Sequence, residues 1–209
     1  MKTKAIDFAG IAMIFLWIVS FSVMVTINFT SLYAFDVDFF DIPERVGLSK
    51  PVIMENYHIL LDYLNKPWVS ELNMPNFPSS KSGLFHFYEV KRLFLLDYGI
   101  LLVTTVASFF YLRFLKQTKR NWVLLRPFMW GIFAPLVILF LIAANFDQLF
   151  VLFHQVFFNN DAWIFNPSTD PIIMALPEGF FMHCFILAFV LIELLIAGVY
   201  FYAKKTAFK

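Results

Sequence analysis

The sequence is short of the residues that cross-link a chain or carry its charge. Its 209 residues include one cysteine, seven glycines and only 15% charged side chains. Cys184 on its own can form no disulfide within the chain, and no small-residue lipobox precedes it. The net charge of +1 offers no excess of positive charge that would attract nucleic acid. These shortages argue against a disulfide scaffold, a lipid-anchored lipoprotein and a nucleic-acid partner.

Apolar residues are what the sequence has in excess. Hydrophobic residues make up 60% of the chain, aromatic residues 20%, and the mean hydropathy is +0.72. About 20 apolar residues cross a bilayer as a helix, and we therefore predict a mainly α, polytopic membrane protein with four transmembrane helices. We place them at 8–30, 94–114, 125–146 and 180–202, where acidic and basic residues are almost absent. The first run is too long for the apolar part of a cleaved signal peptide.

Basic residues predict the orientation of these helices. They flank the two termini and the 115–124 loop, with Asp7 as the one acid on that side. By the positive-inside rule this side is cytoplasmic. The expected divisions are a first transmembrane segment at 1–30, an extracytoplasmic domain at 31–93, transmembrane helices at 94–114 and 125–146 joined by the cytoplasmic loop 115–124, a second extracytoplasmic loop with an interfacial helix at 147–179, and a last helix with a cytoplasmic tail at 180–209. The two outer loops should form an extracytoplasmic cap.

The first outer loop contains one clear helical pattern. Ser49 is a suitable N-cap, and Pro67 ends the pattern. Ile53, Tyr57, Leu60 and Leu64 should pack inward, whereas His58 should be solvated. In the second outer loop, the charge-free stretch from Gln148 to Asn160 is too short to span a bilayer and suits an interfacial segment.

Several catalytic motifs are missing. The chain has no G-x-S-x-G, no H-E-x-x-H, no P-loop and no dinucleotide fingerprint. A thiol nucleophile at His183–Cys184 is less plausible than simple packing at a helix start. A metal site made by His86, His154 and a carboxylate is conceivable, but we expect neither a metal nor a cofactor.

Two histidines on separate outer segments remain as candidates for chemistry. His86 and His154 lie near Glu89, Asp161 and Asp170 in polar stripes at the edge of apolar runs. Histidine titrates near neutral pH, which suits general acid-base catalysis. We therefore treat these two imidazoles as candidate acid-base groups at the lipid–water boundary.

The stretches that carry these residues resemble the lipoprotein intramolecular transacylase (Lit) family of Gram-positive bacteria. The strongest match is FHQVFFNNDAWIFNPSTDPIIMALPEGFF at 153–181, which includes Trp163, and HFYEVKRLF and NYHILLDYL match further segments. In the family's pattern an aspartate usually stands where this chain has Glu89, and another where it has Asn166. Those two positions are therefore weaker site candidates than the histidines.

The resemblance implies an enzyme that moves the sn-2 acyl chain of a diacylglyceryl-modified lipoprotein to the α-amino group of the same cysteine. Its substrate would be a lipoprotein in the bacterial cell membrane, with the active site on the outer face. The implied catalytic residues are His86 and His154, with no covalent acyl-enzyme and no cofactor. Glu89 or Asp170 could orient an imidazole, Tyr88 or Lys91 could stabilise developing charge, and Asp161 and Trp163 would support the site.

Two other functional classes compete with this one. A small-solute transporter would use broken helices and charges at the membrane midplane, whereas here the polar groups lie outside the apolar runs and Glu193 is the one acid within a span. A non-enzymatic assembly or scaffold protein would hold a partner through its outer domain and would tolerate loss of both histidines.

Overall fold

The predicted mainly α membrane fold is confirmed. The computed structural model describes residues 2–207, except for the side chains of Lys2 and Ala143, and every regular element in this range is a helix. Four helical segments are long and apolar enough to cross a membrane: Thr3–Asn28, Lys81–Gln117, Asn121–Ile142 and Glu178–Thr206. Within the most apolar stretch of each segment, only 11–28% is buried inside the protein. The remainder is available to contact lipid. Lys209, one of the basic residues of the predicted cytoplasmic tail, lies outside the described residues.

The chain divides into two compact units. Unit 1 comprises 1–26, 97–144 and 185–209, and unit 2 comprises 27–96 and 145–184. Unit 1 holds most of α1 (Lys2–Asn28), the second part of α5 (Lys81–Gln117), and most of α10 (Glu178–Thr206). It also contains η1 (Asn121–Leu124), α6 (Leu125–Gly131) and α7 (Phe133–Ala144). Its core includes Ile14, Ile18, Leu115, Phe128 and Ile196.

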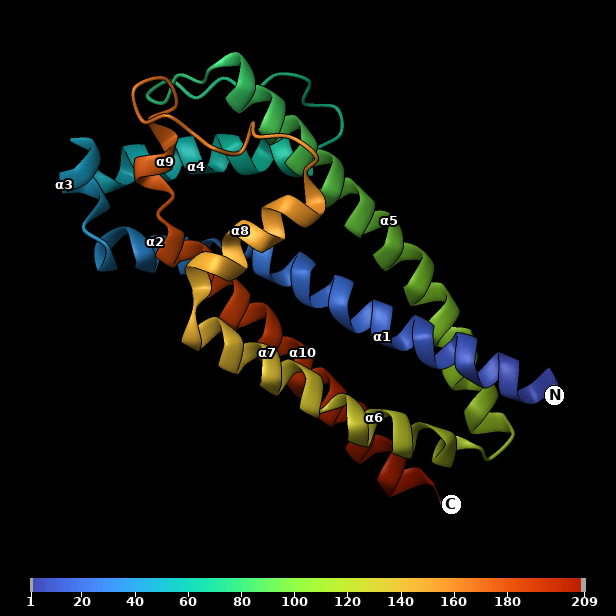
Figure 1. Ribbon diagram of the computed structural model, residues 1–209. Coiled ribbons are helices and arrows are strands. Elements are labelled where there is room, and N and C mark those ends of the chain that lie inside the picture. The colour runs from blue at the N-terminus through green and yellow to red at the C-terminus, as the bar shows by residue number, and fades with distance from the viewer. Residues whose placement is uncertain (1, 208–209) are drawn as a thin grey trace. The chain divides into compact units, whose positions relative to one another are not determined.

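Unit 2 is built from short helices around the start of α5. These are α2 (Thr30–Phe39), α3 (Ile42–Val46), α4 (Lys50–Asn65), α8 (Phe146–Phe157) and α9 (Ile172–Ala175). The α3 helix contacts α2, α4 and α9, and Figure 1 shows these elements gathered around α4. Because α8 and α9 come from the second predicted outer loop, this unit joins both loops into one core.

The α4 helix forms where its sequence pattern predicts. Ile53, Tyr57, Leu60 and Leu64 are buried and His58 is exposed, as expected for an amphipathic helix. The backbone of Ser49 occupies the N-cap position, although its side chain makes no capping hydrogen bond. Residues 66–80 then run without regular structure until Lys81 begins α5.

Candidate active site

His86 and His154 meet inside unit 2. His86 lies near the start of α5, and His154 lies in the last turn of α8 on the buried face that also carries Phe146. The centroids of the two imidazole rings are 5.8 Å apart. The two residues are only 7% and 9% exposed. The structure thus brings together the two histidines that the sequence singles out.

Aromatic rings surround both imidazoles. The ring centroid of His86 lies 4.7 Å from that of Phe158 and 5.6 Å from that of Phe165, and both contacts are edge to face. His154 stacks on Trp163 with centroids 4.6 Å apart and planes 27° apart. Its ring also lies 4.3 Å from that of Phe150. We call this set the aromatic cage: Phe150, Phe158, Trp163 and Phe165. The ring of Trp163, a residue predicted to support the site, stacks on that of His154.

The hydrogen bond of His154 fixes which of its nitrogens can react. Nδ1 lies 2.8 Å from the backbone carbonyl oxygen of Phe150 one turn earlier. A carbonyl oxygen only accepts, so Nδ1 carries the proton and Nε2 of the neutral ring is left as the acceptor. Burial lowers the pKa of His154, and the bond to Phe150 opposes that shift only in part. His154 is therefore held as a neutral base near pH 7.

His86 offers a second buried nitrogen. Its Nδ1 is enclosed and has no hydrogen-bond partner among residues 2–207. Leaving a buried polar atom unpaired costs about 1–3 kcal/mol, and such atoms are uncommon in folded proteins. An unsatisfied imidazole nitrogen beside a second imidazole is an arrangement suited to proton transfer rather than to packing.

Glu89 contacts the segment after α8, which carries three residues of the aromatic cage: Phe158, Trp163 and Phe165. The side-chain amide of Asn160 donates to both carboxylate oxygens of Glu89, at 2.9 and 3.1 Å. Asn160 also accepts from the backbone N–H of Ala162 at 2.9 Å. Because Asn160 immediately precedes the turn to Trp163, this contact fastens the segment after α8 onto α5. We call it the Glu89–Asn160 clamp, and it gives Glu89 a contact different from the predicted one with an imidazole.

Asp170 also connects the second outer segment to the start of α5. Its carboxylate accepts from the backbone N–H of Ser80 at 2.8 Å and from the hydroxyl of Thr169 at 2.7 Å, and the residue is 2% exposed. An added Cβ at Gly83 would collide with the same carboxylate, so a glycine permits this close approach. Asp170 therefore joins the second outer segment to the first turn of α5 instead of contacting a ring.

The remaining predicted site residues make contacts elsewhere or are exposed. The ammonium of Lys91 is buried, donates to the carbonyl of Val69 and lies 4.4 Å from the ring centroid of Tyr63. Tyr88 is half-exposed, and Asp161 is exposed. No group of three or more His, Cys, Asp or Glu side chains that could hold a metal ion occurs between residues 2 and 207.

One buried polar pair was not predicted from the sequence. The ring of His183 bonds through Nδ1 to the fully buried carboxylate of Asp36 at 2.7 Å, and it contacts the rings of Phe39 and Phe40. Burial raises the pKa of Asp36, and the contact with His183 offsets part of the rise. The pair joins α2 to the start of α10 across 147 residues, a separation with no local pattern. His183 thus does more than pack at a helix start.

The comparisons with known proteins agree on one family. The model of the family described as "Lipoprotein intramolecular transacylase Lit" matches residues 8–181. A solved structure of the membrane integral Lit from Bacillus cereus is 31% identical, with a TM-score of 0.90 over 97% of this chain and 95% of that chain. The comparison with curated proteins found no match.

Two further structures of the same Bacillus cereus protein carry a replaced histidine. The arginine variant is 31% identical with a TM-score of 0.82, and the alanine variant is 30% identical with a TM-score of 0.84. Each covers 97% of this chain and 92% of that chain. By both the family match and the structural matches, this chain belongs to the Lit family of membrane-integral lipoprotein intramolecular transacylases.

Proposed function

We propose that the enzyme moves the sn-2 acyl chain of an S-diacylglyceryl cysteine onto that cysteine's α-amino group, giving an N-acyl S-monoacylglyceryl lipoprotein. The observation that carries the proposal is the pair of buried imidazoles, 5.8 Å apart, inside the aromatic cage. The family membership supports the lipoprotein substrate. It also replaces the transporter and scaffold alternatives with an enzyme.

The reaction needs proton transfer and orientation. The α-amine, with an ordinary pKa of about 7.7–8.0, loses a proton and its nitrogen attacks the ester carbonyl carbon. As the bond to the sn-2 oxygen breaks, the second proton that the attacking nitrogen gives up passes to that oxygen, which becomes a hydroxyl. One ester becomes one amide and one alcohol, so the step needs no further reactant. Amine and ester belong to one molecule, so binding supplies the proximity.

His86 and His154 share the acid and base roles in this scheme. Nε2 of His154 is the atom placed to accept a proton, because its Nδ1 is already committed to the carbonyl of Phe150. The buried Nδ1 of His86 provides the neighbouring group that moves or stabilises charge. Direct attack by the amine requires no acyl-enzyme. Cys184, packed in the core of unit 2, has no part in the scheme.

The surface of α8 fits a lipid-anchored substrate. Leu152, Val156 and Phe157 are more than half exposed, while His154 on the same helix is buried. An amphipathic helix of this kind binds the headgroup–acyl boundary through its apolar face. We infer that α8 lies at the outer membrane surface and that both outer segments, 31–93 and 147–179, are extracytoplasmic, in line with the positive-inside rule.

Mass spectrometry of lipoprotein N-terminal peptides tests the proposal. A host that makes only diacylglyceryl lipoproteins should yield the N-acyl, monoacyl form when this chain is expressed. Cys184→Ala should give the same product, and the stopped reaction should show no acyl-sized mass increase on the protein. Unchanged diacyl peptides with a well-expressed chain contradict the transfer, and an acyl adduct on the protein contradicts the direct route.

A further inference from the structure

A cavity lies in unit 1, remote in sequence from His86 and His154. It has a volume of about 440 Å³ and is lined by Asp7, Trp122, Val123, Leu125 and Arg126. Its residues come from the start of α1, from η1 and from the first turn of α6. Three of the lining residues are apolar, one is acidic and one is basic. Which charge the cavity presents depends on the contacts of that acid.

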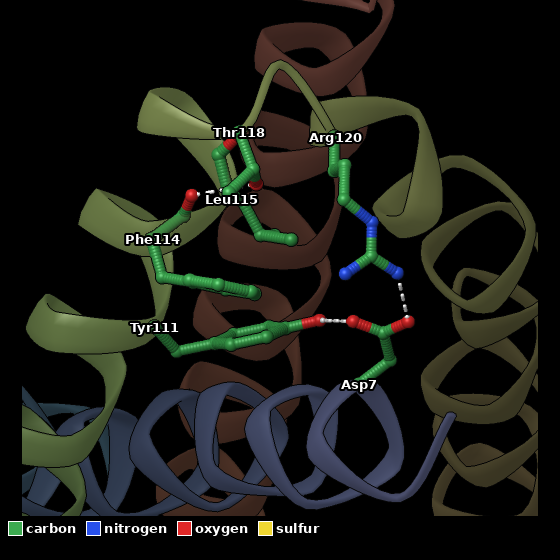
Figure 2. A network of polar contacts seen from close by, with 6 residues as sticks. All are labelled: Asp7, Tyr111, Phe114, Leu115, Thr118 and Arg120. Atoms are coloured by element: carbon green, nitrogen blue, oxygen red, sulfur yellow. Dashed lines mark hydrogen bonds and ion pairs between the residues drawn. The ribbon is translucent and has the colours of Figure 1, made fainter. Parts of the chain in front are cut away.

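Asp7 is already neutralised by its own neighbours. Its Oδ2 pairs with the guanidinium of Arg120 at 2.5 Å, and its Oδ1 accepts from the hydroxyl of Tyr111 at 3.2 Å (Figure 2). Both charged side chains are mostly buried, at 22% exposed for Arg120 and 14% for Asp7. The turn after α5 allows this pairing, because Lys119 takes a left-handed conformation and the N–H of Arg120 bonds to the carbonyl of Leu115.

Arg126 is then the free charge of the cavity. It is exposed, and no carboxylate pairs with it among the described residues. The ends of α1, α5 and α10 lie close to the turn that precedes α6, since Asp7 bonds to Arg120 and Asn121 bonds to Thr206 at 3.0 Å. These ends bring further cations without acidic partners in the described chain: Lys4, Arg113, Lys116, Lys119, Lys204 and Lys205. The local potential is therefore positive.

Trp122 gives the cavity an interfacial side. It is 53% exposed and stands at the first turn of the span Asn121–Ile142. Tryptophan is enriched at this depth because its ring is apolar and its N–H prefers the headgroup region. Val123 and Leu125 continue the apolar wall toward the span. An occupant would therefore meet a cation at one end and hydrocarbon-like surface along the other.

We propose that this cavity binds the headgroup of an anionic phospholipid from the leaflet at the basic end of unit 1. Arg126 holds the phosphodiester, because a guanidinium offers paired donors in the geometry that phosphate oxygens accept. Trp122, Val123 and Leu125 contact the glycerol and the first acyl carbons. Basic pockets between transmembrane helices are known to bind phospholipid headgroups in this way. The site goes beyond the acyl-transfer reaction and does not depend on it.

Native mass spectrometry of the purified full chain tests the site. The protein is incubated with equimolar phosphatidylglycerol and phosphatidylcholine in mixed micelles, and retained lipids are identified. The wild-type protein should retain phosphatidylglycerol preferentially. Arg126→Gln should reduce that preference about tenfold, the loss expected for one charge-assisted contact, and Arg126→Lys should lie between the two.

Arg113→Gln is the matched control. Arg113 is an exposed arginine at the same end of unit 1 that does not line the cavity. It should leave the preference unchanged, whereas an equal loss in both variants means diffuse attraction and overturns the site. Equal retention of the two lipids by the wild-type protein also overturns it. A chase with millimolar inorganic phosphate separates the sources: displacement of the lipid by phosphate alone assigns the cavity to a free anion instead.

Discussion

His154 has one ring nitrogen committed and one available, so glutamine is an informative replacement for it and for His86. Glutamine keeps a hydrogen-bonding side chain but cannot titrate. We predict that His86→Gln and His154→Gln each lower the rate of N-acyl product formation about a hundred- to ten-thousand-fold, the usual contribution of a general acid or base. The double variant should be scarcely slower than the slower single one, because groups that act as a unit are not additive. Time courses by mass spectrometry measure these rates.

His58→Gln is the control for that experiment, because His58 is exposed on α4. His183 does not serve, since its replacement would leave the buried carboxylate of Asp36 without its partner. Each variant is compared at equal expression and equal melting temperature in detergent. Folded histidine variants that form product at the wild-type rate would remove both side chains from the mechanism.

Because the pKa of folded His154 is lowered, the free energy of unfolding should depend on pH. Unfolded histidine titrates near 6.5, whereas folded His154 takes up its proton only at lower pH. Between those two values the unfolded chain binds the extra proton, so stability falls as the pH drops through this window and is retained above 6.5. Thermal melts from pH 7.5 to 5 should therefore decline more steeply for the wild-type protein than for His154→Gln. Parallel curves would mean that His154 titrates normally in the folded state.

The candidate histidines could be chosen from residue type and position, whereas contacts with partners distant in the sequence could not be predicted. The two imidazoles stand out in the sequence because the chain has only four histidines, and these two lie in polar stripes beside apolar runs. Nothing local to Asp36 indicates His183, and nothing local to Glu89 indicates Asn160, 71 residues away. Tertiary packing alone decides those pairings.

The Glu89–Asn160 clamp joins two elements, α5 and the segment that follows α8. Asn160→Asp places two carboxylates against each other and should release that segment from α5. We predict that this variant loses about tenfold or more in rate, because the release disturbs Trp163 and the orientation of His154 that its stacking maintains. Adding Glu89→Gln to the same chain supplies an amide that can donate to the introduced carboxylate, and this second change should restore much of the rate.

The reciprocal pair separates positioning from catalysis. If Glu89 itself moved protons, the swapped pair would stay inactive, because glutamine does not titrate. Recovery in the double variant therefore indicates a positioning role, and continued loss at wild-type melting temperature contradicts it. The separate rates and melting temperatures of the two single variants complete the double-mutant cycle.

Elements with a strong internal pattern formed as predicted. The α4 helix buries its predicted face and ends at Asn65, and α10 (Glu178–Thr206) covers the predicted span 180–202. By contrast, α5 extends well beyond its apolar run, because its first four turns pack within unit 2 rather than in lipid. The hydropathy of a segment indicates where lipid can cover a helix, but tertiary contacts decide where that helix begins.

The topology of the whole molecule is open to a direct labelling experiment. We predict that cysteines at Ser70 and Ser168, both exposed, react with an impermeant maleimide on intact cells, and that one at exposed Gln117 reacts only after lysis. The background is Cys184→Ala, which removes the native thiol. The reverse pattern would place His86 and His154 on the cytoplasmic side, away from mature lipoproteins.

Inhibitors of this enzyme would face the same surroundings as its substrate. A compound directed at Nε2 of His154 must leave water and lie against the rings that contact the two imidazoles, which are those of Phe150, Phe158, Trp163 and Phe165. A fixed charge on the reactive end would lose its hydration there without a counter-ion to replace it. Selective compounds should therefore be uncharged amphiphiles with a neutral tetrahedral centre, such as a hydrated ketone in place of the ester. Reagents built to acylate an activated serine or thiol should be poor starting points.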